Sequence, residues 1–214
     1  VVHNPVDLTR FAQGRDLRGE LGIAPSKVIV SFVGQIRDIK GVQDFIAMAR
    51  LIDAPSVVFL IAGECRDPMS FAGAYSQDDL QTMIGGDARI RYIGYVDRVE
   101  DVYASSDIVV VPSRWQEPLG LIAIEAGACS KPVIATRVGG LPEIIEDGRT
   151  GYLVETQSPA ALADAVRHLI ANPEQRTEMG EAARERIVSQ FAATPVAAFE
   201  DALIQNAGDG CARA

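Results

Sequence analysis

Six short apolar runs constrain the fold of this chain more than any other feature of its sequence. They are rich in β-branched residues and lie at 27–34, 56–63, 89–94, 107–113, 132–136 and 150–154. Because these runs have no polar face, they predict strands of a sheet that is covered on both sides, which in practice is a parallel sheet with helical crossovers. The stretch after the first run has the spacing of an amphipathic helix instead. The alternation predicts an α/β fold with a doubly wound parallel sheet.

The predicted helices lie between and after these strands, at 41–52, 78–84, 99–106, 118–129, 158–170, 173–191 and 195–205. There is no tandem repeat and no low-complexity tract, so one compact unit is expected. We expect an interdomain segment at 1–20, the sheet domain at 21–193, and a C-terminal helix with a frayed tail at 194–214.

Charge and cysteine content exclude several classes of protein. The formal net charge of −9, from 20 Lys+Arg and 29 Asp+Glu, disfavours nucleic acid as a partner, because affinity for that polyanion comes from clustered cations. Cys65, Cys129 and Cys211 are odd in number and form no CxxC, which indicates neither a disulfide framework nor a zinc site and favours a reducing, cytoplasmic compartment. His3 and His168 lack an HxxxH spacing, and no metal-chelating D-x-D occurs in the sequence, so no metal site is expected.

The ends of the chain carry little targeting information. No apolar run approaches the about 20 residues of a membrane span. The sequence begins Val-Val-His-Asn-Pro, without an initiator Met or the pattern of a signal peptide. We therefore expect a piece of a longer protein.

The loop after the first strand is the first candidate ligand site, because ligands of open parallel sheets bind beyond the carboxyl ends of the strands. Gly34 ends the strand, and Lys40 with Gly41 begins the helix. Backbone N–H groups at a helix start, with a lysine beside them, suit an anion such as a diphosphate. The spacing is neither GxGxxG nor that of a Walker loop, so a glycine-rich turn with a solvated lysine is the alternative.

The loop after the fourth strand carries two carboxylates that are hard to explain by packing. Glu125 interrupts the apolar stretch LGLIAI-E-AGAC, and a buried carboxylate needs a ligand or a cation. It suits the vicinal hydroxyls of a ribose, while Gly120 lets a phosphate approach the helix start and Glu117 reaches toward a sugar. The alternatives are an ion pair of Glu125 with a buried cation and a solvated Glu117. Trp115 either lines the sugar pocket or shields the loop.

The run VVVPSRWQEPLGLIAIEAGACSKPVIATRVGGLPEIIEDGRTGYLV (109–154) resembles the donor-binding half of GT-B retaining glycosyltransferases of family 4, also called group 1. It contains an E-x7-E motif at Glu117 and Glu125, followed by Lys-Pro-Val and Gly-Gly-x-Pro-Glu segments. VVHNPVDLTRF resembles the start of the second domain of these enzymes, and FVGQIRDIKGV resembles their diphosphate-binding loop. The resemblance covers about residues 1–190.

This resemblance implies a Rossmann-like C-terminal domain that binds a nucleotide sugar of the UDP, GDP or ADP type, in a retaining, metal-independent transfer of a hexose to an acceptor hydroxyl. It implies catalytic roles for Glu117, beside the donor sugar, and Lys40, at the diphosphate, and it places Glu125 at the ribose hydroxyls. The remaining donor-binding positions that it implies are Gly34 and Arg37 in the first loop, Gly63, Tyr95 and Val96 around the base, and the backbone of Leu119, Gly120, Leu121 and Ile122.

Two positions depart from the family pattern. Gln35 stands where the family usually has an arginine that serves as a second cation for the diphosphate, and Arg37 either turns inward to replace it or faces solvent. Ser130 stands where a glycine is common, which affects only the turn. Gln35 keeps open a non-catalytic nucleotide-binding or regulatory domain, and a further alternative is another GT-B reaction, such as that of an epimerase or a glycan phosphorylase.

The resemblance also implies partners outside this chain. An N-terminal domain, absent here, would bind a sugar, lipid or small-molecule acceptor, so the isolated chain is expected to bind donor without turnover. Peripheral membrane association of the longer protein is a further expectation. The C-terminal helix would expose Val196, Phe199 and Leu203, which predicts dimerisation through that face.

Overall fold

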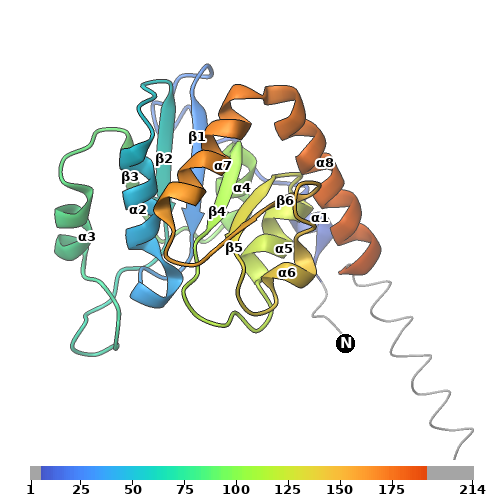
Figure 1. The fold of residues 1–214 in the computed structure, drawn as a ribbon. Coiled ribbons are helices and arrows are strands. Elements are labelled where there is room, and N and C mark those ends of the chain that lie inside the picture. Colours follow the sequence, from blue (N-terminus) through green and yellow to red (C-terminus); the bar gives the residue numbers. More distant parts are fainter. Residues whose placement is uncertain (1–5, 192–214) are drawn as a thin grey trace, which may run out of the picture.

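Six parallel strands form the centre of the structure, a computed structural model that describes residues 6–191 (Figure 1). They are β1 (Val28–Val33), β2 (Val57–Ala62), β3 (Ile90–Gly94), β4 (Ile108–Val111), β5 (Val133–Thr136) and β6 (Gly151–Val154). Their order in the sheet is β3-β2-β1-β4-β5-β6, and every pair is parallel. The predicted doubly wound, Rossmann-like α/β fold is confirmed. Its chain order reverses between β1 and β4, where such sheets bind ligands.

The helices are α1 (Leu8–Phe11), α2 (Val42–Leu51), α3 (Gln77–Ile84), α4 (Val99–Ser105), α5 (Leu121–Ala128), α6 (Leu141–Ile144), α7 (Pro159–Ala171) and α8 (Pro173–Gln190), with a 3₁₀ turn at Asp38–Lys40. The short helices α1 and α6 and the 3₁₀ turn were not predicted, because a single turn shows no hydrophobic period. No helix among the described residues is long and apolar enough to cross a membrane. The helix predicted at 195–205, with Val196, Phe199 and Leu203, lies outside those residues.

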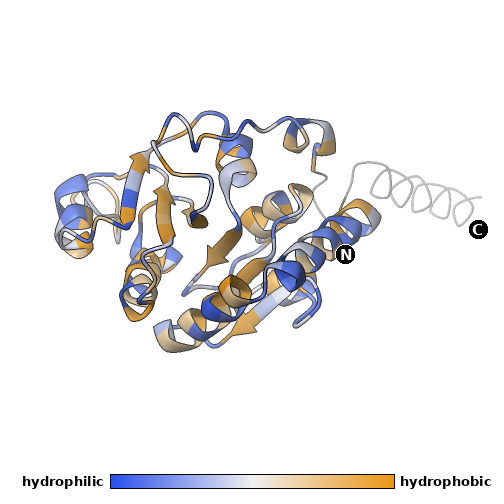
Figure 2. Cartoon of the chain, turned by 90° about the horizontal axis from the view of Figure 1, so that it is seen from above, coloured by the Kyte–Doolittle hydropathy of each residue, from blue (hydrophilic) through white to orange (hydrophobic). Residues whose placement is uncertain are grey.

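The sheet is buried on both faces, as its apolar strands require. Every residue of β2, β4 and β5 is buried, and Figure 2 shows the strands as the hydrophobic interior between helices of mixed polarity. Helices α2, α3 and α7 contribute to the core on one face, α1, α4, α5 and α6 contribute to the core on the other, and α8 contributes to both through Met179 and Ile187. The carboxyl ends of the strands stay uncovered by these helices and carry the loops of interest.

Residues 6–20, expected as an interdomain segment, pack against this domain in the structure. Val6, Phe11 and Leu17 are buried in its cores. Arg10 and Arg15 bond to the buried carboxylates of Glu100 and Asp101 on α4, each at 3.0 Å. The segment therefore adds charged as well as apolar contacts to α4 and α5.

Two glycines let the loops after β1, β2 and β4 approach one another. A Cβ at Gly63 would lie 1.7 Å from the carbonyl oxygen of Gly34, and a Cβ at Gly41 would lie 1.9 Å from that of Pro112. Both glycines have positive φ, 152° and 76°, which side chains disfavour. The contact of Gly41 with Pro112 holds the start of α2 against the end of β4.

Replacing Gly41 by alanine is expected to lower the free energy of unfolding by about 2 to 5 kcal/mol, because positive φ and a backbone clash act together. Gly22 is a matched control, since its φ is 62° but a Cβ at this position would have nothing within 4 Å. Gly22→Ala is expected to cost only the conformational part, about 1 to 2 kcal/mol. Urea unfolding of both variants measures the difference, and equal losses would contradict the role assigned to the Pro112 contact.

Candidate functional site

Two adjoining hollows lie at the carboxyl ends of the strands, on either side of the turn after β1. The larger, of about 500 Å³, we call the Glu117 hollow, and the smaller, of about 370 Å³, the Tyr95 hollow. Val33, Gly34 and Gln35 line both. The first spans the ends of β1 and β4, where the topology predicts a ligand site, and its size is that of a small-molecule pocket.

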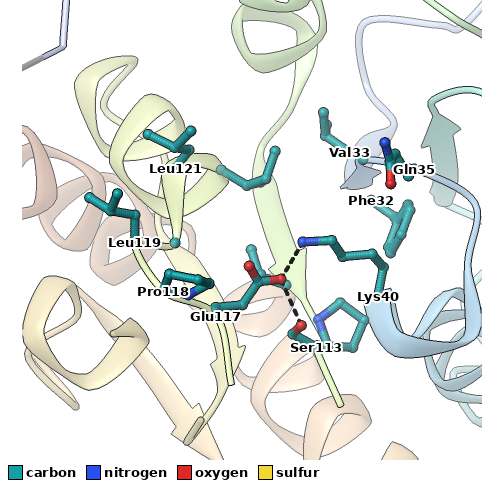
Figure 3. Close-up of a pocket in the computed structure, with 14 residues that line it drawn as sticks. Phe32, Val33, Gln35, Lys40, Ser113, Glu117, Pro118, Leu119 and Leu121 are labelled. Atoms are coloured by element: carbon teal, nitrogen blue, oxygen red, sulfur yellow. Dashed lines mark hydrogen bonds and ion pairs between the residues drawn. The ribbon is translucent and has the colours of Figure 1, made fainter. Parts of the chain in front are cut away.

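An ion pair crosses the Glu117 hollow. Lys40 Nζ, from the 3₁₀ turn after β1, lies 2.5 Å from Glu117 Oε1, from the loop after β4. Ser113 Oγ donates to the same oxygen at 2.8 Å, and Figure 3 shows the three side chains converging. Glu117 is only 8% exposed, so it is not the solvated loop carboxylate that was considered as an alternative. The opposite charges of Lys40 and Glu117 satisfy one another inside the hollow.

A second ion pair fixes the loop that carries Glu117. Arg114 makes a bidentate contact with the buried carboxylate of Asp44 on α2, at 2.6 and 2.7 Å. This hydrogen bond raises the pKa of Arg114. Sequence reasoning assigned no role to Ser113 or Arg114, because their partners lie far away in the chain and only the fold brings them together.

The start of α5 forms another wall of the Glu117 hollow. Gly120 has a φ of 59°, and a Cβ there would lie 2.8 Å from the Ile144 side chain. The positions expected to offer backbone N–H groups, Leu119, Gly120, Leu121 and Ile122, all line this hollow. The first N–H groups of a helix lack intrahelical partners and carry its positive dipole end, so this wall favours an anion.

Glu125 lines neither hollow and accepts a hydrogen bond from a buried tyrosine instead. Tyr103 Oη donates to Glu125 Oε2 at 2.8 Å. Burial raises the pKa of Glu125, while the Tyr103 hydrogen bond and the charge of Arg10 act in the opposite direction. Burial also raises the pKa of Tyr103 well above its ordinary value, so that the hydroxyl stays a donor. A buried cation was the alternative partner considered for Glu125; its direct partner is a hydroxyl.

The Tyr95 hollow contains the positions expected around a base. Gly63, Tyr95 and Val96 line it, and Tyr95 is 69% exposed. Two arginines join them: Arg66, which pairs with Glu64 of the same hollow at 2.7 Å, and Arg10. No sequence signal pointed to Arg10, because it reaches the hollow only through the packing of α1 beside the sheet.

The structure brings Arg37 to neither hollow. Its Nη2 donates to the carbonyl oxygen of Ala72 at 2.8 Å, and its guanidinium lies 4.7 Å from the centre of the Phe71 ring. The inward turn toward a diphosphate is therefore absent from this arrangement, and Arg37 lies partly exposed against the loop at 71–72. Trp115, which is 43% exposed, also lines neither hollow. Ser130 adopts a φ of 57°, the conformation a glycine would take at this turn.

Between residues 6 and 191, no three or more His, Cys, Asp or Glu side chains come together in a group that could hold a metal ion. The polar side chains that line the two hollows are cations, carboxylates, the hydroxyls of Ser113 and Tyr95, and the Gln35 carboxamide.

A family model and several curated proteins match most of this chain. A family model described as glycosyl transferases group 1 matches residues 14–186. The chain is 34% identical to the α-maltose-1-phosphate synthase of Mycolicibacterium smegmatis, over 89% of this chain and 52% of the relative. It is 36% identical to a D-inositol 3-phosphate glycosyltransferase of Corynebacterium glutamicum, over 98% of this chain and 53% of the relative. The chain thus spans about half the length of these curated relatives.

Solved structures share the fold. A sucrose-phosphate synthase from Thermosynechococcus elongatus superposes with a TM-score of 0.83 at 29% identity, over 98% of this chain and 52% of that one. The C-terminal domain of a glycosyl transferase group 1 family protein, LpcC, from Francisella tularensis has a TM-score of 0.74 at 30% identity, over 88% of this chain and 99% of that one. Anabaena HepE in complex with UDP has a TM-score of 0.86 at 21% identity, over 96% of this chain and 57% of that one, a likeness of fold alone.

Glu125→Gln is expected to stabilise the protein at neutral pH but not in acid. Because burial raises the pKa of Glu125 above its ordinary value of 4.5, the folded state disfavours the carboxylate, and stability is lost as pH rises through the folded pKa. The neutral glutamine avoids this loss. Urea unfolding from acid to neutral pH measures the difference between wild type and variant.

Tyr103→Phe is the companion variant. It removes the hydrogen bond that lowers the pKa of Glu125. The free energy of unfolding of Tyr103→Phe should therefore fall more steeply toward neutral pH than that of the wild type. In the double variant with Glu125→Gln this extra pH dependence should disappear. A wild type and a Glu125→Gln variant that differ by the same amount at every pH would contradict this account.

Proposed function

We propose that the chain, which belongs to the glycosyl transferases group 1 family, is the nucleotide-sugar-binding domain of a retaining, metal-independent glycosyltransferase. The observation that carries the proposal is the Lys40–Glu117 pair at the sheet's switch point, facing the start of α5. A cation and backbone N–H groups on two walls suit a diphosphate, and a buried carboxylate between them suits sugar hydroxyls. The reaction would transfer a hexose from a nucleoside diphosphate sugar to an acceptor hydroxyl.

In this proposal the diphosphate lies between Lys40 and the N-terminus of α5. When the bond between the anomeric carbon and the phosphate breaks, negative charge grows on the leaving phosphate oxygen. Lys40 and the N–H groups of Leu121 and Ile122 face that charge from fixed positions, which is the condition for electrostatic stabilisation of a transition state. We propose that this protein charge allows transfer without a divalent cation.

Glu117 would orient the donor sugar. Its carboxylate is held by Ser113 from the end of β4, so it stays in place when a phosphate competes for Lys40. Sugar hydroxyls then donate to Glu117 while the acceptor hydroxyl attacks the anomeric carbon on the face that the diphosphate leaves, which retains the configuration. The acceptor's proton passes to the leaving phosphate oxygen. The ribose hydroxyls would turn to Glu125, and the base would lie in the Tyr95 hollow beside Gly63 and Val96.

Two of the matched structures support a donor-binding domain. The LpcC domain, which this chain covers almost completely, is a C-terminal domain. HepE, of the same fold, was solved with UDP and with UDP-glucose. We propose that this chain is likewise the C-terminal part of a cytoplasmic enzyme, that a separate domain binds the sugar, lipid or small-molecule acceptor, and that this chain alone binds donor without turnover.

Calorimetric titration with UDP, GDP and ADP, and with their glucose or mannose conjugates, tests the proposal. We expect one diphosphate to bind with the same affinity in the presence and absence of EDTA. Its sugar conjugate should bind with an affinity that differs from that of the diphosphate itself. Glu125→Ala should weaken binding at least tenfold. Binding that needs a divalent cation, or no binding by any of the ligands, would overturn it, and binding indifferent to the sugar would favour a nucleotide-sensing domain.

Lys40→Gln separates phosphate recognition from nucleoside recognition. Loss of a hydrogen bond between charged groups is worth about 1.5 to 3 kcal/mol, or roughly ten- to a hundredfold in affinity. We expect that loss for the diphosphate and no change for the nucleoside, by the same calorimetry. Lys27→Gln is a control, because Lys27 donates to the Pro55 carbonyl outside both hollows. A nucleoside affinity that falls as far as the diphosphate affinity would contradict the assignment.

A further inference from the structure

Arg10 brings a cation to the Tyr95 hollow from a segment that precedes the whole sheet. It belongs to α1, beside α5, and lines the hollow together with Gly34 and Gln35. Its side chain is 47% exposed. Lys40 lines the neighbouring hollow, and Gly34 lines both. The two cations therefore lie on either side of the Gly34 turn, Arg10 in the Tyr95 hollow and Lys40 in the Glu117 hollow.

The guanidinium of Arg10 is held on one edge only. Its Nε and Nη2 donate to Glu100 Oε2 at 3.1 and 3.0 Å. Within residues 6–191, its Nη1 has no hydrogen-bond partner. Glu100 also lies 3.5 Å from Arg98, so two arginines share one buried carboxylate. A planar guanidinium fixed on one edge, with the other edge uncommitted, is suited to a phosphate.

The other candidate cations of this region are committed elsewhere. Arg37 contacts Phe71 and Ala72. Arg66 is paired with Glu64, which itself lines the hollow and would repel an anion there, whereas Glu100, the partner of Arg10, does not line it. Gln35, at the turn itself, is neutral. Of the described arginines near the turn, Arg10 therefore offers the cation that a second phosphate contact requires.

We propose that Arg10 is the second cation of the donor site and that its guanidinium contacts the phosphate next to the ribose, across the Gly34 turn from Lys40. This inference rests on the proposed function and adds to it a binding residue outside the loops that follow the strands. Arg10 would exchange none of its contacts with Glu100, because only its free edge meets the ligand.

The test compares Arg10→Gln with Arg98→Gln, using the nucleoside, monophosphate and diphosphate of the base that wild type binds. Arg98 pairs with the same Glu100 but does not line the hollow, so its variant reports the cost of losing a partner of Glu100. We expect Arg10→Gln to weaken the monophosphate and diphosphate roughly ten- to a hundredfold, to leave the nucleoside unchanged, and to flatten the salt dependence of diphosphate binding. Arg98→Gln should change none of these.

Arg10→Lys keeps the charge and guards against a folding defect in Arg10→Gln; it should retain most of the diphosphate affinity. Equal losses in Arg10→Gln and Arg98→Gln, an equal loss for the nucleoside, or no loss at all would each overturn the inference while leaving the proposed function intact. A wild type that binds no nucleoside diphosphate would overturn the proposed function itself, and the inference with it.

Discussion

The adjacency of β1 and β4 is the constraint on which the site depends. These strands are hydrogen-bonded neighbours although β2 and β3 separate them in the chain, and the loops that leave their carboxyl ends run to opposite sides. The close contact of Gly41 with Pro112 brings those loops together, and the Arg114–Asp44 ion pair holds them in place. Lys40 and Glu117 meet only because of this arrangement. Their 2.5 Å contact is thus a consequence of sheet topology and of one glycine.

The carboxylates of the site sit in places that a stable core would leave apolar. Glu117 is buried and held by a lysine and a serine, and Glu125, which is half-buried and lines neither hollow, is held by a tyrosine. Burying a carboxylate costs free energy even when it is hydrogen-bonded, because hydration is lost. Within residues 6–191, the side-chain donors of each carboxylate bond to one of its oxygens, Oε1 of Glu117 and Oε2 of Glu125, and the other oxygen keeps acceptor capacity for further hydroxyls. The large apolar cores on both faces of the sheet offset this cost.

The sequence was sufficient for the strands and the sheet class, because these follow from local β-branched runs, and it singled out Glu125 as a charge within an apolar stretch. It was not sufficient for Arg37, Ser113 or Arg10. Arg37 contacts Phe71 and Ala72, in a loop after a different strand, and Arg10 depends on a four-residue helix, α1, that has no period to detect. Side-chain direction in loops is decided by contacts between segments far apart in the chain, and no local spacing encodes them.

Because Lys40 is already paired with Glu117, an anion that enters the hollow must compete with Glu117 for Lys40. A diphosphate carries more charge than one carboxylate and offers several oxygens to the same ammonium, so it competes well for Lys40. Glu117 does not follow Lys40, because Ser113 holds its Oε1 from the buried end of β4. In the donor complex proposed above, the carboxylate left behind would lack a cation although Glu117 is only 8% exposed, and sugar hydroxyls would be the neutral donors that stabilise it. Binding of the diphosphate would thus prepare the carboxylate for the sugar and link the two halves of the donor through one residue pair.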